Sequence, residues 1–473
     1  MITTSTTAVA AEISDIDVSA RRPLLYLIGS GLLWLVVSGI FAVINAVQLH
    51  TPEFLAHCSL LTYGRVHAAQ ETAFLYGWAG NAGVAIALWL LSRLGLTIFR
   101  GAVVATLGGV FWNIGVLLAV AGILIGDATS FPGLELPTYT HWLLLVSFGF
   151  MAVPGVLAWS GRKHETAFAA QWYALAALFL FPWFFSIAEV SLFLAPGRGT
   201  AQSVIAAWYA QNVYSLWLAP IALGALYYLL PKISAKPLPH YEFASLGFWT
   251  LIAVACWTGP RVLVNGPVPA WIPTLSIAAA AVVLMHFWIV WLNVRGVFAT
   301  GGSVVLKFAA FGFASYLLVG IADAVFSLRS VARVTQFTYM QDALTALALI
   351  GSITLIFFAA IYYIAPRLCG RAWPSSALVR AHFAAAIIGF VVLVVALAVA
   401  GWVQGQALNS TASFADIAAR TRPWLLVATA AQALLLIGNL LVTFHFLKIV
   451  ACPREEAAAL TFRTPVAMEA SAS

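Results

Sequence analysis

The side chains best suited to chemistry in this sequence are histidines and carboxylates that lie within or beside long apolar runs. His67 and Glu71 are four residues apart, so in a helix they share one face, one turn from each other. An imidazole in that setting can ligate a haem or another metal together with His50, His57 or His141. Alternatively, His67 hydrogen-bonds only to Glu71 or to water. The sequence leaves both interpretations open.

Four carboxylates fall inside the apolar runs themselves: Glu71, Glu189, Asp323 and Asp342. An ionised carboxylate at the centre of a hydrocarbon layer costs about 2.5 to 3.5 kcal/mol on insertion scales. Residues retained at that cost usually line an internal cavity or pair with one another. We therefore treat these four as candidate functional residues.

The elements that must position these residues are set by the composition. Of the 473 residues, 63% are hydrophobic and only 8% are charged. Uncharged runs of about 20 residues, enough to cross about 30 Å of hydrocarbon, recur along the chain, and at that length only helices satisfy their own backbone hydrogen bonds. The predicted fold is all-α, a polytopic membrane protein with twelve spans at residues 24–48, 69–92, 102–125, 140–160, 169–195, 204–230, 243–259, 271–293, 304–328, 340–366, 379–402 and 424–447.

The distribution of lysine and arginine predicts the orientation, because basic loops are retained on the cytoplasmic side. With the N-terminus inside, all but seven of the 23 basic residues fall on the cytoplasmic side, the seven being Arg65, Arg198, Arg261, Arg329, Arg333, Arg420 and Arg422. We therefore expect a multi-pass protein of the inner (cytoplasmic) membrane with both termini in the cytoplasm. Contact with anionic lipid explains the net charge of +7, so no nucleic-acid partner is expected.

The two ends of the chain differ in composition from the rest. Residues 1–23 are rich in Ser, Thr and Ala with scattered acids, and residues 451–473 are similar, which predicts a disordered cytoplasmic tail at the N-terminus and a second cytoplasmic tail at the C-terminus. Residues 24–450 are expected to form one membrane domain. The first apolar run is longer than the core of a cleavable signal, so it is predicted to stay in the protein.

Two stretches carry a family resemblance. They are WYAQNVYSLWLAPIALGALYYLLPK from Trp208 and FWTLIAVACWTGPRVLVNGPVPAW from Phe248. Both resemble subunit I, the catalytic subunit, of the cbb-type or C-family cytochrome c oxidases in the haem-copper oxidase superfamily. GRVHAAQETAFLYGWAGN from Gly64 and AAIYYIAPRLCGR from Ala359 extend the resemblance, which keeps the same order from about residue 24 to 450. The family also has twelve spans.

The resemblance implies an oxygen-reducing centre, with one haem held by two histidines and a second haem facing a copper held by three. In this chain, those positions carry other residues. Gln70 stands six residues after Gly64, where a haem ligand is expected, and Gln211 stands two residues after Tyr209, where a copper ligand is expected. The complete set of former haem and copper ligand positions is Gln70, Gln211, Arg261, Val262, Gln341 and Ala343.

These replacements argue against the family's activity. A neutral carboxamide is a weak ligand for haem iron or copper, and a guanidinium at Arg261 repels a metal cation. We therefore predict a divergent paralogue with a degenerate active site and assign no catalytic residue, although the sequence leaves open whether the chain is an enzyme. Copper is not expected, and haem is expected only if an unorthodox ligand such as His67 holds it.

The resemblance also suggests a role for the intramembrane acids. They lie at the level where an oxidase holds the propionates of its haems, so protein carboxylates can supply that negative charge beside arginines on the same side. This predicts a polar cavity in the former haem space, lined by Glu71, Glu189, Asp323, Asp342, Arg65, Arg329 and Arg333. The alternative is plain solvation of side chains that snorkel to water. Likewise, Gln70, Gln211 and Gln341 either form a buried amide network or are tolerated in an empty space.

Three functions are compatible with these features. The first is a non-catalytic paralogue that associates with the subunits of a respiratory electron-transfer complex. The second is a redox-active oxidase subunit that binds haem through unorthodox ligands. The third is a carrier or sensor of small molecules or ions that uses the emptied cavity.

Overall fold

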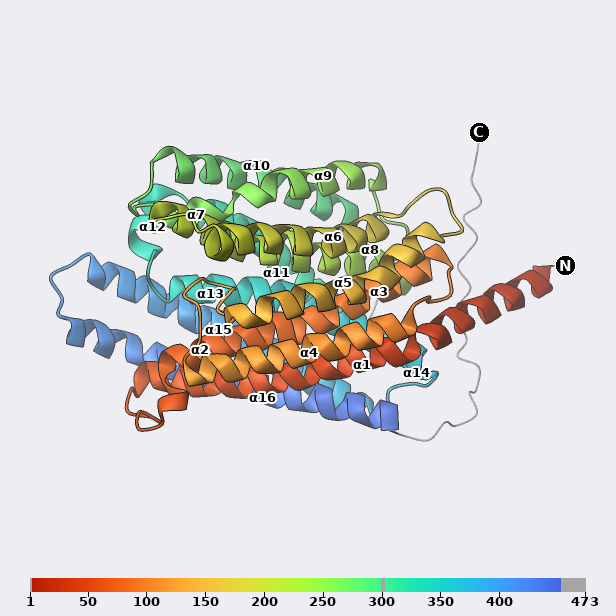
Figure 1. Cartoon of the computed structure of the whole chain (residues 1–473), viewed down its shortest axis with the longest axis horizontal. Coiled ribbons are helices and arrows are strands. Elements are labelled where there is room, and N and C mark those ends of the chain that lie inside the picture. Colours follow the sequence, from red (N-terminus) through yellow and green to blue (C-terminus); the bar gives the residue numbers. More distant parts are fainter. Residues whose placement is uncertain (1, 299–302, 452–473) are drawn as a thin grey trace.

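The chain folds into a bundle of long helices that run nearly parallel to one axis (Figure 1). The structure is a computed structural model, and it describes residues 2–298 and 303–451. Within these residues it contains no β-strand, and twelve helical segments are long and apolar enough to cross a membrane. The predicted all-α, twelve-span architecture is confirmed.

The spans consist of one or more consecutive helices, several of which include a π-helical or 3₁₀ segment. Their bounds are α1 (Ile2–His50); α2, η2 and α3 (Tyr63–Thr72, Ala73–Gly80, Asn81–Gly95); α4 (Ala102–Ile125); α5 (Thr138–Ser160); α6 and η3 (Ala169–Glu189, Val190–Leu194); α7, η4 and α8 (Thr200–Asn212, Val213–Leu218, Ala219–Ser234); η5, α9, η6 and η7 (Tyr241–Phe243, Ala244–Val254, Ala255–Trp257, Gly259–Leu263); α10 (Trp271–Val294); α11 (Val304–Phe326); α13, η9 and α14 (Met340–Ala346, Leu347–Thr354, Leu355–Cys369); α15 (Ser376–Leu408); and α16 (Phe414–Ala451). The short helices η1 (Ser59–Leu61) and α12 (Arg329–Thr335) lie between spans.

The N-terminal segment corrects one prediction. Instead of a disordered tail over residues 1–23, helix α1 begins at Ile2 and continues without a break into the first span. The reason is a buried anchor, since Asp17 pairs with Arg93 of α3 at 3.0 Å and accepts a hydrogen bond from Trp89 at 3.0 Å. Ile16, the preceding residue of α1, is also buried. The predicted C-terminal tail lies, apart from Ala451, outside the described residues.

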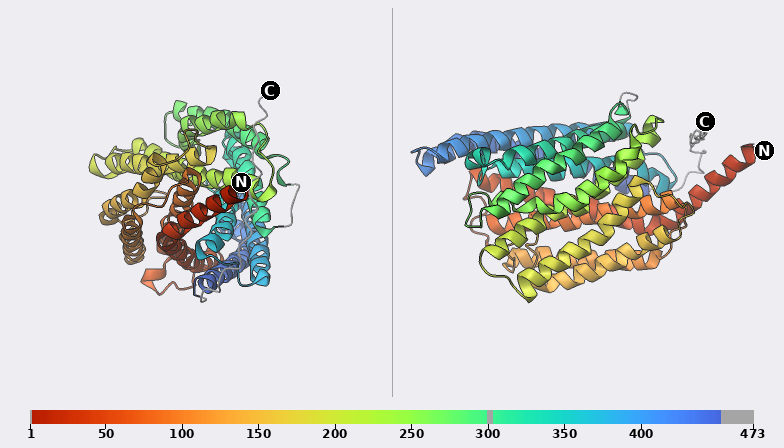
Figure 2. Two further views of the ribbon diagram at one scale, coloured as in Figure 1. Left: turned by 90° about the vertical axis from the view of Figure 1, so that its right-hand side faces the viewer. Right: turned by 90° about the horizontal axis from the view of Figure 1, so that it is seen from above.

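Three spans form the inside of the bundle, and they are the three that carry Gln70, Gln211 and Gln341. In the most apolar stretch of the second and sixth spans, 94% of the residues are buried, and in that of the tenth span 72% are buried. The corresponding share in the other nine spans is 33–50%. Each inner span contains a π-helical segment a few residues after its glutamine, namely η2, η4 and η9. The end-on view in Figure 2 shows how the remaining helices surround this interior. Wider π-helical turns often occur at functional sites, so the backbone geometry points to the same three positions as the sequence.

Large aromatic side chains fill the bundle beside these segments. Trp78, Trp112 and Trp217 are fully buried, and Trp112 packs edge-on against Trp217 with ring centroids 6.4 Å apart. The ring of Phe181 from α6 lies 4.1 Å from that of Trp217. This dense aromatic packing fills much of the middle of the bundle beside η2 and η4.

Candidate functional site

A cavity of about 810 Å³ lies at the end of the bundle where α1 ends and α2 begins. Its walls come from α1, α2, η2, α7, η4, η7, α11, α13, η9, α15 and α16, together with the loop after α4. Three of the predicted intramembrane acids line it, and so do five of the six positions at which the resemblance implies a haem or copper ligand. These residues are Glu71, Asp323 and Asp342, and Gln70, Gln211, Arg261, Val262 and Gln341.

One wall carries a cluster centred on Arg261. Its Nη1 donates to Gln211 Oε1 at 2.8 Å and to the carbonyl oxygen of Thr258 at 2.9 Å, and its Nη2 donates to Asp323 Oδ1 at 2.5 Å. The ion pair is largely enclosed, because the side chains of Arg261 and Asp323 are only 12% and 22% exposed. The guanidinium therefore ties η7 to α7 and to α11.

The backbone before Arg261 explains why its side chain reaches α7. A Cβ atom on Gly259 would lie 2.4 Å from the carbonyl oxygen of Ala207, so η7 can approach α7 this closely only with glycine at that position. Val262, the next residue and another position where the resemblance implies a copper ligand, lines the cavity, and its carbonyl oxygen accepts a hydrogen bond from Gln336 at 2.5 Å. The Gly-Pro motif that carried the resemblance thus sets the approach of these two helices.

A second cluster joins α1 to α2. Asn45 Nδ2 donates to Gln70 Oε1 at 3.2 Å and lies 3.1 Å from Nδ1 of His67. Because an amide nitrogen can only donate, Nδ1 accepts and the ring proton of His67 sits on Nε2. That Nε2 lies 3.6 Å from Glu71 Oε1. Both nitrogens of His67 are thus directed at protein groups.

The first residues of α13 form the third wall. Gln341 and Asp342 line the cavity, whereas Ala343 is buried in the packing and does not. Asp342 is surrounded by protein, yet it keeps a large accessible surface because it faces the cavity. In the described part of the chain it has neither a hydrogen-bond nor an ion-pair partner, and its nearest charged groups are His67 and Glu71.

Glu135, in the loop after α4, adds another acid behind Glu71. Burial raises the pKa of Glu135 well above its ordinary value, and the neighbouring Glu71 carboxylate is the second cause of this increase. Its Oε1 accepts a hydrogen bond from the amide of Gly133 at 3.2 Å, and its carboxyl hydrogen-bonds to that of Glu71. Contact with a second carboxyl therefore adds to burial in favouring the neutral form of Glu135.

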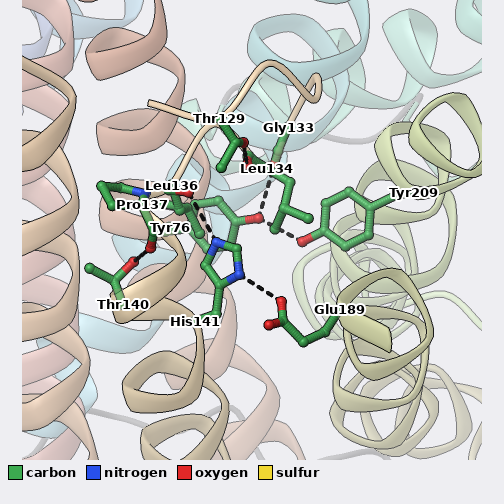
Figure 3. Close-up of polar contacts among 10 residues, drawn as sticks. All are labelled: Tyr76, Thr129, Gly133, Leu134, Leu136, Pro137, Thr140, His141, Glu189 and Tyr209. Atoms are coloured by element: carbon green, nitrogen blue, oxygen red, sulfur yellow. Dashed lines mark hydrogen bonds and ion pairs between the residues drawn. The ribbon is translucent and has the colours of Figure 1, made fainter. Parts of the chain in front are cut away.

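Glu189 and His141 lie apart from the cavity lining and pair with each other. Glu189 Oε2 and His141 Nδ1 are 2.6 Å apart, and His141 Nε2 bonds to the carbonyl oxygen of Leu136 at 3.0 Å (Figure 3). Both side chains are buried between α5 and α6. Figure 3 also shows the hydroxyls of Tyr76 and Tyr209, 2.6 Å apart, beside this pair. Glu189 therefore differs from the predicted cavity set because a buried imidazole satisfies it.

The three arginines assigned to the cavity also lie away from its lining. Arg65 donates to the carbonyl oxygens of Ser59 and Leu124 and holds η1 against α4. Arg329 donates to Thr274 Oγ1 at 2.6 Å on the surface, and Arg333 is exposed. A position near the outer end of a span therefore does not predict that an arginine lines the cavity, because these side chains hydrogen-bond to local oxygen atoms or face water instead.

Of the three histidines that were candidates to join His67, His57 is exposed in the segment after α1, and His50 and His141 hydrogen-bond to other groups. His50 bonds to Thr51 and, through Nε2, to Thr429 of α16 at 3.0 Å. Across residues 2–298 and 303–451, no three His, Cys, Asp or Glu side chains are grouped as they are around a bound metal. His67 is the only histidine among the residues that line the cavity.

The sequence did not single out Asn45, Tyr63 or Glu135. Tyr63 stacks on His67 with ring centroids 5.7 Å apart, and it lines the cavity with Asn45. A polar Asn45 near the end of the first apolar run was a usable signal, since polar residues within a span usually face the bundle interior. Glu135 had no such signal, because nothing in the sequence places its loop over the bundle.

Comparison with known proteins places this geometry in a family. The family model described as cytochrome c and quinol oxidase polypeptide I matches residues 22–434. The chain belongs to this family. It is 24% identical over 448 residues to cytochrome c oxidase subunit 1 of Rhodobacter capsulatus, covering 88% of this chain and 83% of the relative. It is 27% identical over 461 residues to a cytochrome c oxidase subunit 1 homolog of Agrobacterium tumefaciens, covering 90% and 83%.

A cbb3-type relative and a solved structure agree with the oxidase polypeptide I assignment. The chain is 22% identical over 433 residues to a cbb3-type cytochrome c oxidase subunit of Stutzerimonas stutzeri, covering 87% of this chain and 91% of that one. A chain from a cryo-EM structure described as a heme-copper terminal oxidase dimer superposes with a TM-score of 0.73 at 17% identity, over 93% of this chain and 86% of that one. The resemblance seen in the sequence is confirmed, and the chain is a membrane protein like cytochrome c oxidase subunit I.

Proposed function

We propose that this oxidase polypeptide I family member does not reduce oxygen and acts as a non-catalytic paralogue within, or in association with, a respiratory electron-transfer complex of the inner membrane. The observation that carries the proposal is the contact of Arg261 with Gln211 and Asp323. In the family resemblance, Gln211, Arg261 and Val262 occupy the three copper-ligand positions. A protein side chain with a fixed positive charge therefore stands where the family holds a metal cation.

The chemistry of these three residues does not fit copper. A guanidinium stays protonated at all relevant pH values and has no lone pair to donate, and Val262 has no side-chain donor atom. Gln211 offers an amide oxygen, but that oxygen already accepts the hydrogen bond from Arg261. Copper favours imidazole or sulfur ligands, and none of the three positions supplies either.

The haem positions lead to the same conclusion. Gln70 and Gln341 replace imidazoles with carboxamides, Ala343 has no ligating group, and Gln70 is bonded to Asn45. We infer that neither haem of the family is held in its usual way. Two of the substituted glutamines instead hydrogen-bond to protein side chains, Gln70 to Asn45 and Gln211 to Arg261.

The second candidate function, a redox-active subunit with unorthodox ligands, depends on His67. This histidine borders the cavity, and its side chain is 37% exposed. A haem could use it only after its contacts with Asn45 and Glu71 were broken. This alternative therefore predicts that His67→Ala removes any haem from the protein, whereas the non-catalytic reading predicts no haem to remove.

The deciding experiment is spectroscopic. The full-length protein, purified in mild detergent from cells supplied with haem and copper, is examined by a reduced-minus-oxidised optical spectrum, haem extraction and copper quantitation. We expect neither cofactor in stoichiometric amount and no oxygen uptake with a reduced donor. A stoichiometric haem or copper signal, or sustained oxygen uptake, would contradict the proposal.

The association and the orientation need separate tests. Native gel electrophoresis of gently solubilised membranes should place the chain in a complex with respiratory subunits, and migration as an isolated chain would contradict that part. The basic loops support a cytoplasmic location for both termini. A reporter that is active only in the cytoplasm should be active at the end of the full chain, and a periplasmic signal would reverse the orientation.

A further inference from the structure

The loop between α4 and α5, residues 126–137, forms part of the cavity wall and is fastened to the bundle by two buried side chains. We call it the wall loop, and its residues 130–133 line the cavity. The hydroxyl of Tyr76 donates to the carbonyl oxygen of Gly133 at 2.6 Å, and Nε2 of His141 lies 3.0 Å from that of Leu136 (Figure 3). Two hydrogen bonds from the bundle interior therefore hold this part of the wall in place.

The wall loop is also bonded within itself. The backbone N–H of Thr129 donates to the carbonyl oxygen of Glu135 at 3.0 Å, and the hydroxyl of Thr129 donates to that of Leu134 at 2.5 Å. Gly126, with φ +111°, begins the loop in a conformation that glycine adopts without strain. Because these bonds close the loop on itself, it can move as one piece when its anchors are released.

The contact between His141 and Glu189 requires a proton. A carbonyl oxygen can only accept, so Nε2 of His141 carries a hydrogen and donates it to Leu136. Nδ1 lies 2.6 Å from Glu189 Oε2, and two such atoms approach this closely only with a proton between them. That proton sits either on the imidazole or on the carboxyl. In both cases Nε2 keeps the hydrogen that anchors the wall loop.

Loss of the shared proton breaks that anchor. A neutral imidazole has one N–H, whereas two acceptors then face the ring, the carbonyl oxygen of Leu136 and the carboxylate of Glu189. The carboxylate is the stronger acceptor, and a buried charge without a donor costs more than a buried carbonyl without one. The single hydrogen therefore moves to Nδ1, and Nε2 turns a lone pair toward Leu136. Rising pH thus releases the wall loop at this point.

The other groups around the pair come from α7, η2 and η3. Tyr209 of α7 interacts electrostatically with Glu189. Its hydroxyl lies 2.6 Å from that of Tyr76 in η2, and it donates there because Tyr76 uses its own hydrogen on the wall loop. Phe193 of η3 contributes only an aromatic ring, 4.9 Å from the ring of His141. Among the described residues, Glu189 forms no ion pair with a lysine or arginine.

The remaining titratable groups belong to the wall loop and its neighbours. Glu135 contacts Glu71 of α2, and its loss of a proton at rising pH would add negative charge beside that carboxylate. Asp127 accepts a hydrogen bond from Tyr139 at 3.4 Å on the exposed side of the loop. Glu135 therefore acts in the same direction as the pair, and an experiment has to separate the two.

We propose that the wall loop is a proton-controlled gate of the cavity, closed while His141 and Glu189 share a proton and open once that proton is lost. In the closed state Gly133 packs on α7, since a Cβ atom on it would lie 3.7 Å from the Cα of Ala210. Ala210 itself lines the cavity. Opening uncovers this wall and admits small molecules beside α7. The gate does not rest on the proposed loss of haem and copper, because neither residue of the pair is an implied ligand position.

The experiment measures alkylation of single cysteines by iodoacetamide in the full-length protein, held in nanodiscs, with its four native cysteines replaced by alanine. Leu134→Cys reports on the inner side of the wall loop, because Leu134 is 1% exposed and lies between the two anchored carbonyls in the chain. Ala210→Cys reports from the cavity. Thr411→Cys, in the exposed turn between α15 and α16, supplies the reference rate. Dividing by it removes the effect of pH on thiol reactivity itself.

Both reporters should be labelled about tenfold faster, relative to the reference, at about pH 10 than at about pH 6. That factor is expected when an opening equilibrium loses one hydrogen bond, and the range covers proton loss from an imidazole or a buried carboxyl. Glu189→Gln gives Nδ1 an amide donor that does not titrate, so labelling should stay slow throughout. His141→Phe should make it fast throughout. The matched control His50→Phe, at a histidine bonded to Thr429, should keep the pH response.

The gate is overturned if labelling of the reporters is independent of pH, or if Glu189→Gln keeps the full response. It is also overturned if Leu134→Cys becomes reactive while Ala210→Cys stays protected, because the loop would then move without uncovering the cavity. Glu135→Gln should retain the response, and its loss there would assign the effect to Glu135 instead. Tyr76→Phe removes only the other anchor and should speed labelling at both pH values, which keeps the test independent of His141→Phe. Size-exclusion profiles and tryptophan fluorescence confirm that each variant is folded.

Discussion

The ion pair between Arg261 and Asp323 gives the sharpest test of how charged residues stabilise the interior of this protein. Arg261→Met removes the guanidinium while preserving most of the side-chain length. It leaves the Asp323 carboxylate without a cation and Gln211 Oε1 without a donor. Asp323→Asn, made in that background, removes the uncompensated charge. The pair of changes separates the loss of a contact from the burial of an unpaired charge.

The magnitude follows from the burial of the pair. Breaking a fully buried ion pair from one side costs about 3 to 5 kcal/mol, whereas exposed pairs contribute at most about 1 kcal/mol. With side chains 12% and 22% exposed, this pair lies nearer the buried limit, and we expect Arg261→Met to cost about 2 to 3 kcal/mol. Because the double variant carries no unpaired charge, we expect it to recover about 1 to 2 kcal/mol relative to Arg261→Met.

The assay is equilibrium unfolding in mixed micelles of dodecyl maltoside and SDS, followed by tryptophan fluorescence. Buried Trp78, Trp112 and Trp217 make this signal sensitive to interior packing. The control is Arg329→Met, the same substitution at an exposed arginine at the same end of the bundle, which should change stability by less than about 0.5 kcal/mol. The reasoning is refuted if Asp323→Asn fails to rescue Arg261→Met, or if Arg261→Met is no more harmful than the control.

Three further predictions test other parts of the structure. Introducing histidine together at Gln211, Arg261 and Val262 should create copper binding that the wild type lacks, measured by metal quantitation and electron paramagnetic resonance; a folded triple variant without copper would show that these positions do not converge as the family match requires. Glu135 has a raised folded-state pKa, so the native state holds its proton more tightly than the unfolded state, and stability should fall as the pH rises above about 4.5 toward that raised pKa. Thermal unfolding across this range should show a smaller decline for Glu135→Gln, and parallel curves would exclude Glu135 as the cause. Asp17→Ala should leave Arg93 unpaired, cost about 3 kcal/mol and expose the start of α1 to limited trypsin digestion that the wild type resists; equal digestion would mean that the anchor is not needed.

The sequence predicted the twelve spans well because a bilayer imposes a length and a composition on each of them. The third span was predicted at residues 102–125, which are the bounds of α4. The N-terminal tail was misjudged for a related reason. Residues before Pro23 are too polar to read as a membrane span, yet Asp17 is buried because Arg93 and Trp89 satisfy its carboxylate. Composition measures average hydrophobicity, and it does not detect a charge that is paired inside the fold.

The candidate site was predicted in part, and the division has a physical cause. Glu71, Asp323 and Asp342 line the cavity as expected, because acids inside apolar spans turn toward the bundle interior. Glu189 has the same sequence signature, but its partner His141 comes from another span. Arg65, Arg329 and Arg333 lie near helix ends, where backbone carbonyls and water compete for them. Whether a charged side chain faces the cavity or another partner depends on its neighbours in space, which a single sequence does not specify.

The three inner spans share one feature of backbone geometry. Each changes to a π-helical segment a few residues after Gln70, Gln211 or Gln341. Protein packing lies directly beside these segments, because Trp112 and Trp217 are buried against each other and Gly259 closely approaches α7. If the proposed loss of both haems and copper is correct, this packing is what stabilises the three spans in the absence of metal ligation.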